Sequence, residues 1–335
     1  MTMHDLSKIR PSGLLYYSDD QPGITRRRCG SGFAYYASDG TLIRDRKERD
    51  RITAIAVPPA YDEVWITPHP NGHLQATGRD ARGRKQYRYH PDWSEHRATV
   101  KFDQLSIFGR ALPRLRGFIA RSLGAETGSA ELALGTVLAL IDRASIRIGN
   151  QAYATQNQSF GATTLLGRHV RFRKDRLILS FPSKGGARIR RTLSGPALQR
   201  AMSRIHDLPG AALATWLDES QIPHVLRSEQ VNAVIAEICG EGMTAKTFRT
   251  WNGTHAAFCI ALRPGPVTIA EMAEAAAERL DNTAAVARKS YVHPAVIDLA
   301  RLDPDQRLRL LRASPGPGLS GLRSGESELI GLLER

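Results

Sequence analysis

The pattern of apolar residues changes near Trp93, and that change restricts the folds that the chain can adopt. Between about Gly32 and Tyr89, short alternating runs are separated by turn residues, as in β-strands joined by hairpins. Beyond Trp93, apolar residues recur at helical spacing. Strands followed by helices are typical of an α+β fold. We therefore predict a mainly β N-terminal lobe and a largely helical lobe after it.

Two hairpins are predicted in the N-terminal lobe, because turn dipeptides stand between runs with strand character. The first joins 32–36 to 41–45 through Asp39-Gly40, and the second joins 64–67 to 73–77 through Asn71-Gly72.

Helices and one further sheet are predicted in the second lobe. Strands return between His169 and Leu193, where turns at Lys174-Asp175 and at 183–186 separate three short alternating runs. The predicted helices lie around 134–141, around 213–217, and from a capping box formed by Thr268 and Glu271 to Leu280.

The length of 335 residues, 41% of them hydrophobic, is enough for about two domains. We place a β-rich domain at residues 1–93 and a second domain at 94–300. Residues 301–335 contain the run Pro315-Gly316-Pro317-Gly318, so we expect them to form a loose tail.

The charge of the chain indicates a polyanionic partner. There are 47 Lys and Arg against 33 Asp and Glu, a net charge of +14 that is spread along the sequence. No apolar run is long enough to span a membrane, so nucleic acid is the expected partner and a membrane is not. Residues 1–13 lack the apolar run of a signal peptide, and the three cysteines are isolated. We expect a cytoplasmic, nucleoid-associated protein.

A short basic helix ends in a tyrosine. A helix that starts near Asn282 should stop close to Tyr291, because Pro294 disfavours helical geometry at His293. The phenol would then stand at the end of the helix, where it could attack a phosphodiester. Taken alone, the same pattern also fits a surface tyrosine beside solvated charges.

Three cationic residues stand in distinctive local contexts elsewhere. Arg147 follows a helix that ends near Arg143, Lys184 occupies a glycine-flanked hairpin tip, and Arg249 lies at the start of another helix. Cleavage of a phosphodiester by a side chain needs cations on the non-bridging oxygens and a proton donor for the leaving 5′ oxygen. Arginine suits the first task and a mobile lysine the second. Each of these three residues is also compatible with a simpler role, in which its charge only attracts and orients the phosphate backbone of a nucleic acid.

In the order and local sequence of these segments, the chain resembles the type IB DNA topoisomerases, in particular the small poxvirus-like enzymes of bacteria. The resemblance covers about residues 30 to 300. It rests on Ser145–Asn150 (SIRIGN), Asn157–Leu165 (NQSFGATTL), Lys184 in its hairpin, Arg249 within Lys246-x-x-Arg249, and Tyr291 within Arg288–Pro294 (RKSYVHP).

The resemblance implies a role for each of five residues. Arg147, Arg249 and Asn282 would bind the scissile phosphate, Lys184 with Arg147 would protonate the 5′ oxygen, and Tyr291 would form a 3′-phosphotyrosyl bond. The family often has histidine nine residues before the tyrosine, where this chain has Asn282. Asparagine can donate a hydrogen bond but has no titratable proton, so this departure weakens an acid–base role there.

The N-terminal domain is implied to bind DNA. On a strand over 85–89, Tyr87 and Tyr89 share one face and Gln86 points to the other. From the alternation alone, the tyrosines also fit a domain core. The resemblance implies that Gln86, Tyr87 and Tyr89 contact the major groove, with Tyr153 as a further DNA contact. It also implies a catalytic domain at 94–300 of the kind found in tyrosine recombinases, with a three-stranded β-hairpin element, and a clamp of two lobes around DNA.

The implied function is relaxation of supercoiled double-stranded DNA by a monomer, through cleavage and religation of one strand. No cofactor, metal ion or small-molecule substrate is expected, because two arginines and a lysine already neutralise the phosphate. A near match to a P-loop at 240–247 has Ala245 where glycine is needed.

Two alternatives stay open. A tyrosine recombinase or integrase would use nearly the same residues, although it usually has histidine where Lys246 stands. A non-enzymatic nucleic-acid-binding protein would explain the charge but would form no covalent adduct.

Overall fold

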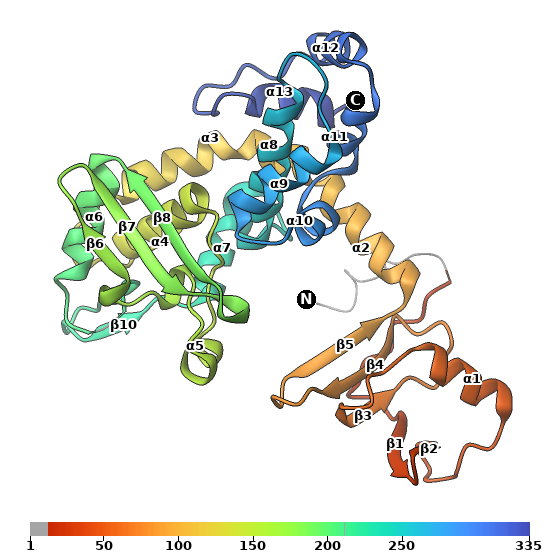
Figure 1. Ribbon diagram of the computed structural model, residues 1–335. Coiled ribbons are helices and arrows are strands. Elements are labelled where there is room, and N and C mark those ends of the chain that lie inside the picture. The colour runs from red at the N-terminus through yellow and green to blue at the C-terminus, as the bar shows by residue number, and fades with distance from the viewer. Residues whose placement is uncertain (1–12, 211) are drawn as a thin grey trace. The chain divides into compact units, whose positions relative to one another are not determined.

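The structure, a computed structural model, describes residues 13–210 and 212–335. The chain divides into two compact units, one ending at Lys101 and one running from Phe102 to Arg335 (Figure 1). Helix α2 (Pro91–Asp103) crosses this division, and the boundary expected between residues 93 and 94 lies within it. Residues 1–12, which belong to the expected 1–93 domain and to the segment inspected for a signal peptide, lie outside the described residues.

The N-terminal unit is built on an antiparallel sheet of five strands in the order β2-β1-β3-β4-β5. Its small core joins Ile24, Val64, Ile66 and Ala76 of the sheet to Ile52 of a helix. Strand β5 forms one edge of this sheet. The elements are β1 (Ile24–Cys29), β2 (Gly32–Tyr36), α1 (Arg46–Ala54), β3 (Asp62–Ile66), β4 (Leu74–Arg79) and β5 (Lys85–Tyr89).

One of the two predicted hairpins is confirmed in full and the other in part. Strands β3 and β4 pair antiparallel around Asn71-Gly72, as expected. The chain also reverses at Asp39-Gly40, where Tyr36 forms an antiparallel bridge with Leu42 and Ile43 donates from its nitrogen to the Tyr35 carbonyl oxygen at 2.9 Å. Residues 41–45 form no regular strand, however, and β2 pairs along its length with the preceding strand β1, which was not predicted. Strand β1 has the sequence ITRRRC and α1 buries only Ile52, so neither shows the apolar pattern that would predict it.

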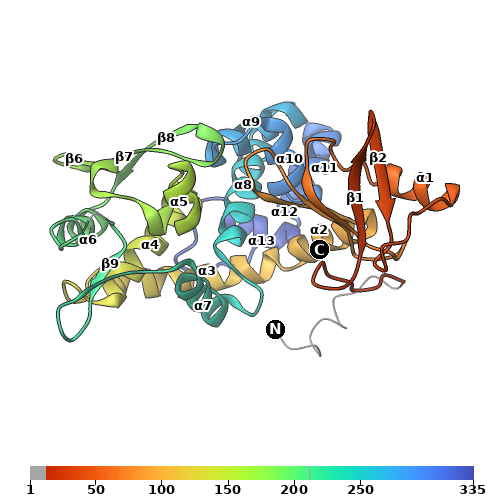
Figure 2. The same cartoon turned by 90° about the horizontal axis from the view of Figure 1, so that it is seen from below.

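The C-terminal unit is largely helical and includes a three-stranded antiparallel sheet in the order β6-β7-β8. Helix α8 contacts α9, which in turn contacts α10, and the three gather side by side (Figure 2). No helix in the described ranges is long and apolar enough to cross a membrane. The helices are α3 (Leu105–Ser122), α4 (Ala130–Ala144), α5 (Gln151–Asn157), α6 (Pro196–His206), α7 (Ser228–Cys239), α8 (Ala245–Ala261), α9 (Ile269–Leu280), α10 (Ala284–Tyr291), α11 (Pro294–Asp298), α12 (Pro304–Arg312) and α13 (Glu326–Leu333). The strands are β6 (Val170–Phe172), β7 (Arg176–Pro182), β8 (Arg188–Ser194), β9 (Thr215–Leu217) and β10 (Pro223–Val225), and short 3₁₀ turns are η2 (Ala162–Thr164), η3 (Gly167–His169), η4 (Lys184–Gly186) and η5 (Leu299–Arg301).

The α+β architecture is confirmed, and so are most of the elements predicted in this unit. Helix α4 covers 134–141, α9 begins after the capping box of Thr268 and Glu271, and the three strands fall within 169–194. The helix predicted around 213–217 is wrong, because this segment contains β9, paired with β10. In this pair, Trp216 stacks on His224 with 4.8 Å between ring centroids. A segment of five residues is too short for its apolar spacing to distinguish a helix from a strand.

The expectation of a loose C-terminal tail is also wrong. Leu329 and Ile330 of α13 are fully buried against the main core. Arg307 of α12 is buried as well, and its guanidinium donates to the carbonyl oxygens of Ala261 at 3.0 Å and Arg263 at 2.9 Å. Ala261 is the last residue of α8 and Arg263 lies just beyond its C-cap, so the tail covers the C-terminal end of that helix.

The ionisation of Glu326, at the start of α13, can be used to test how the C-terminal tail is attached to the core. Burial by itself raises the pKa of Glu326, but hydrogen bonds and the charge of Arg116 bring it from 4.5 down to about 2. A carboxyl group whose pKa is lower in the folded state than in the unfolded state stabilises the folded state at pH values above the unfolded pKa. This stabilisation is lost as the pH falls toward the folded-state pKa. At about 1.4 kcal/mol per pH unit, ionised Glu326 contributes about 3 kcal/mol at neutral pH.

We therefore expect Glu326→Gln to lower the free energy of unfolding most near neutral pH. The difference from the unmodified protein should shrink as the pH falls below about 4.5, measured by urea unfolding over a series of pH values. A difference that stayed constant down to about pH 3 would contradict this pKa.

Candidate active site

Arg147 stands on a backbone segment that is fixed from two sides. Helix α4 ends at Ala144, and its C-cap Ser145 adopts a left-handed conformation with φ of 54°, so that the chain turns toward Arg147. The Arg147 carbonyl oxygen accepts a hydrogen bond from the Ala162 nitrogen at 2.8 Å. A Cβ atom on Gly161 would lie 2.5 Å from that same oxygen, so the two segments can pack this closely only with glycine there. The backbone of Arg147 is therefore placed before any ligand arrives.

Arg249 is held in the interior by backbone carbonyls. It lies in the first turns of α8 with 3% of its surface exposed. Its Nη1 donates to the Ser145 carbonyl oxygen and its Nη2 to the Leu280 carbonyl oxygen at 2.9 Å. Burial lowers the pKa of Arg249, the charge of Arg147 lowers it further, and Tyr291 acts in the opposite direction. The two arginines are thus near enough to repel each other.

Tyr291 is the last residue of α10, so the predicted end of this helix is confirmed. The Arg249 Cζ lies 5.2 Å from the centre of the Tyr291 ring. Helix α8 also contacts the tyrosine backbone one turn later, because Thr254 donates from Oγ1 to the Tyr291 carbonyl oxygen at 3.0 Å. A Cβ on Gly253 would lie 3.0 Å from that oxygen. One helix therefore fixes both the arginine and the tyrosine.

Asn282 joins this group from the link between α9 and α10. Its Oδ1 accepts a hydrogen bond from Arg147 Nη2 at 3.1 Å. Its Nδ2 is buried and has no hydrogen-bond partner among the described residues, and the same is true of Arg249 Nε. Buried donors are nearly always paired in folded proteins. These two unpaired donors, on Asn282 and Arg249, lie with Arg147 in a site that an anion would complete.

Lys184 is not bonded to these four residues in the described part of the chain. It lies exposed in the turn between β7 and β8, and among the described residues it makes no hydrogen bond or ion pair with Arg147, Arg249, Asn282 or Tyr291. Gly185 next to it has φ of 81°, which favours glycine. The base of the hairpin is attached near the Arg147 segment, because Phe160 donates from its nitrogen to the Pro182 carbonyl oxygen at 2.9 Å. The structure thus brings four of the five expected residues together and leaves the fifth on a tip.

The candidate DNA-binding residues are exposed in their own units. Tyr87 and Tyr89 on β5 are 48% and 46% exposed, and their rings stack with centroids 6.1 Å apart. The alternative that these tyrosines form the core of the N-terminal domain is therefore wrong. Gln86 donates from Nε2 to Asp80 Oδ2 at 3.0 Å. Tyr153, on α5 directly after the Arg147 segment, is 50% exposed.

Sequence reasoning missed two supporting residues, Arg191 and Asp281. Arg191 Nη2 on β8 lies 2.6 Å from Asp281 Oδ2 and also donates to the Glu278 carbonyl oxygen at 2.9 Å. Burial raises the pKa of Asp281, while the charges of Arg191, Arg249 and Arg147 lower it. This pair fixes the end of α9 immediately before Asn282. Nothing in the local sequence separates Arg191 from the other arginines of its strand.

Comparison with known proteins supplies independent similarities. The family model for the N-terminal domain of bacterial DNA topoisomerase IB matches residues 32–80. The model for the catalytic core of eukaryotic DNA topoisomerase I matches residues 90–290, more than half of the chain, and ends immediately before Tyr291. DNA topoisomerase 1B of Acanthamoeba polyphaga mimivirus is 29% identical over 299 residues, which are 84% of this chain and 89% of the relative. DNA topoisomerase 1B of Vaccinia virus (strain Copenhagen) is 23% identical over 125 residues, 37% of this chain and 39% of the relative.

Proposed function

Because this chain belongs to the type IB DNA topoisomerase family, we propose that it relaxes supercoiled duplex DNA through a covalent bond between Tyr291 and a 3′ phosphate. The observation that carries the proposal is the group around Tyr291: two arginines and an asparagine, of which Arg249 and Asn282 each have a buried donor without a partner among the described residues. A phosphodiester carries the negative charge and the acceptor oxygens that such a group lacks.

In the proposed reaction, the Tyr291 phenol gives its proton to solvent water and its oxygen attacks phosphorus. The bond from phosphorus to the 5′ oxygen breaks, and the Lys184 ammonium, assisted by Arg147, gives that oxygen a proton. Charge that develops on the non-bridging oxygens is stabilised by Arg147, Arg249 and Asn282. Religation is the reverse step, in which the 5′ hydroxyl attacks phosphorus and the phenol leaves.

The location of Lys184 on the hairpin is compatible with this role. An exposed lysine on a glycine-containing turn can approach the 5′ oxygen once DNA is bound, since catalytic hydrogen bonds often form only in the complex. The energy of the broken bond is stored in the phosphotyrosyl link, so ATP has no part in the proposed reaction. Neutralisation by arginine and lysine also makes the proposed reaction independent of a metal ion.

DNA contacts outside this group are proposed for Gln86, Tyr87, Tyr89 and Tyr153. Stacked, exposed rings on the edge strand β5, with Lys85 Nζ 5.6 Å from the centre of the Tyr87 ring, offer both apolar and cationic contacts to a duplex. The clamp of two lobes and action as a monomer remain predictions.

The proposal is tested by incubating the purified protein with negatively supercoiled plasmid in EDTA, without ATP. We expect a ladder of topoisomers that ends in relaxed circles, because each cycle of cleavage and rotation changes the linking number. Recombined products that require two DNA sites would instead favour a recombinase. If the protein retarded the plasmid in a gel but left its supercoils unchanged, the protein would be a DNA-binding protein without this activity.

A further inference from the structure

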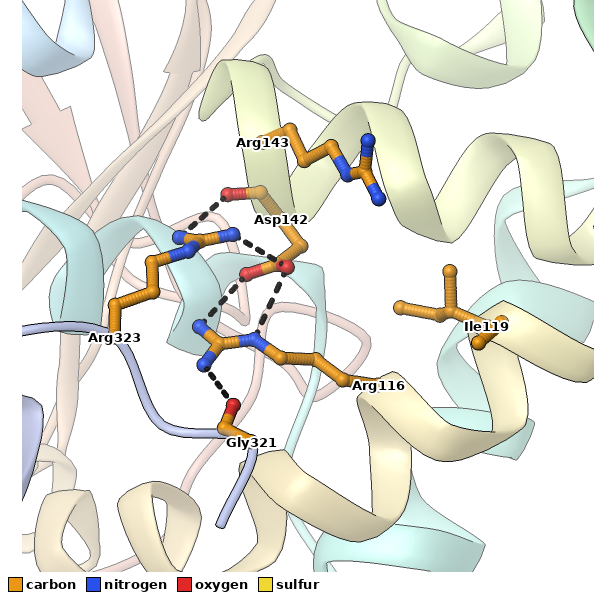
Figure 3. Close-up of a pocket in the computed structure, with 7 residues that line it drawn as sticks. Arg116, Ile119, Asp142, Arg143, Gly321 and Arg323 are labelled. Atoms are coloured by element: carbon orange, nitrogen blue, oxygen red, sulfur yellow. Dashed lines mark hydrogen bonds and ion pairs between the residues drawn. The ribbon is translucent and has the colours of Figure 1, made fainter. Parts of the chain in front are cut away.

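A largely buried group of charged residues connects the C-terminal tail to helix α8, which carries Arg249, and to the end of α4, where Ser145 supplies a carbonyl to Arg249. We call Arg116, Asp142, Arg323 and Glu326 the tail ion cluster. Arg116 of α3 binds Glu326 with its two Nη atoms, at 2.6 and 2.8 Å, and also contacts Asp142 Oδ2 at 3.2 Å. Arg323 Nη2 lies 2.6 Å from the same Asp142 oxygen, and both guanidinium groups turn toward Asp142 (Figure 3). The Glu326 side chain is completely buried.

The cluster holds α8 close to Arg249. Glu326 Oε1 accepts a hydrogen bond from Trp251 Nε1 at 3.0 Å. Trp251 is fully buried and lies two residues after Arg249 in the same helix. A shift of Glu326 would therefore move the part of α8 that carries Arg249.

The cluster also holds the end of α4, which supplies a carbonyl to Arg249. Asp142 lies in the last turn of α4, and its backbone carbonyl oxygen accepts from Asn252 Nδ2 at 3.3 Å. The same Asn252 nitrogen donates to Ser145 Oγ at 3.0 Å, and the Ser145 carbonyl oxygen accepts from Arg249 Nη1. Both the helix that carries Arg249 and the acceptor that orients it are thus connected to the cluster.

We propose that the tail ion cluster, with Glu326 at its centre, positions the Arg249 guanidinium for phosphate binding in the cleavage step. This inference rests on the proposed function of Arg249. Buried ion pairs are weak evidence for stability alone, because desolvation offsets much of their attraction. Their directional hydrogen bonds can instead specify where α3, α4, α8 and the tail meet. Glu326 is accordingly a positioning residue that does not itself touch DNA.

The test uses Glu326→Gln in the full-length protein, which keeps the shape of the side chain but removes the charge that Arg116 binds. We expect the single-turnover rate of DNA cleavage at saturating protein to fall about 10- to 100-fold, because small displacements of a catalytic group have effects of this size. The dissociation constant for DNA should change by less than about twofold, since the cluster does not contact DNA. Thermal unfolding establishes that the variant is folded under the assay conditions.

Glu334→Gln is the matched control. Glu334 follows α13 and pairs with Arg110, on the same helix as Arg116, but the pair is partly exposed and contacts neither Trp251 nor Asp142. Its loss should change the cleavage rate by less than about twofold. If Glu326→Gln does not fold, Arg323→Gln removes a more exposed cluster member and should slow cleavage about three- to tenfold.

A double-mutant cycle separates positioning from a general structural effect. In an Arg249→Ala background, Glu326→Gln should slow cleavage further by no more than about twofold, because the group that it positions is gone. The same fold loss in both backgrounds would overturn the inference, as would an unchanged rate in the folded single variant. If the unmodified protein formed no covalent complex with DNA, the proposed function itself would be wrong, and the inference with it.

Discussion

Replacing Tyr291 by phenylalanine should abolish covalent attachment to DNA while leaving DNA binding within about twofold of the unmodified protein. The variant keeps the aromatic ring that lies beside Arg249, so the local packing is retained. It lacks the phenolic oxygen, the only atom of this side chain that can bond to phosphorus. Denaturing gels of the protein with end-labelled duplex DNA measure the covalent product, and gel shifts measure binding.

A control for the loss of a hydroxyl group is Tyr36→Phe. Tyr36 is at the end of β2 in the N-terminal sheet, where Arg27 lies over its ring, and its replacement should leave the covalent product unchanged. A covalent band that persisted with Tyr291→Phe would refute the nucleophile. Tyr87, Tyr89 and Tyr153, the exposed tyrosines of the proposed DNA contacts, would then be the next candidates.

Lys184→Ala should slow cleavage of an ordinary phosphodiester by about 10²- to 10⁴-fold, the usual effect of losing a general acid. A 5′ alkoxide leaves slowly without a proton, whereas a 5′ thiolate leaves readily. The variant should therefore approach the unmodified rate on DNA with a 5′-bridging phosphorothiolate. Arg249→Ala removes stabilisation of the transition-state charge instead, and it should stay slow on both substrates.

Lys174→Ala is the matched control for this experiment, because Lys174 is an exposed lysine in the other turn of the same sheet. It should cleave both substrates at close to the unmodified rate. Equal defects of Lys184→Ala on the two substrates would mean that this lysine serves phosphate or DNA binding. The proton donor would then be Arg147, the remaining candidate.

Several elements around the candidate site could be predicted because their determinants are local. The capping box of Thr268 and Glu271 opens α9, with the Glu271 carboxylate 2.8 Å from the Thr268 nitrogen. Pro294 ends the helix that carries Tyr291, and turn residues separate β6, β7 and β8. The elements that were missed or misassigned, β1, α1 and β9, bury few side chains in a regular pattern.

Sequence by itself determined the chemical identity of the candidate residues: a tyrosine at a helix end, arginines that keep their charge, and a lysine in a glycine-containing turn. The motifs singled out Arg147, Lys184 and Arg249 among the 47 lysines and arginines, but only the tertiary structure brings Arg147 and Arg249 together with that tyrosine. Arg249 is oriented by the carbonyl oxygens of Ser145 and Leu280, which lie 104 and 31 residues away in the chain. Every residue has a backbone carbonyl, so such contacts leave no mark on the amino-acid sequence. The docking of the tail through Glu326 depends in the same way on partners from α3 and α8, which only folding brings together.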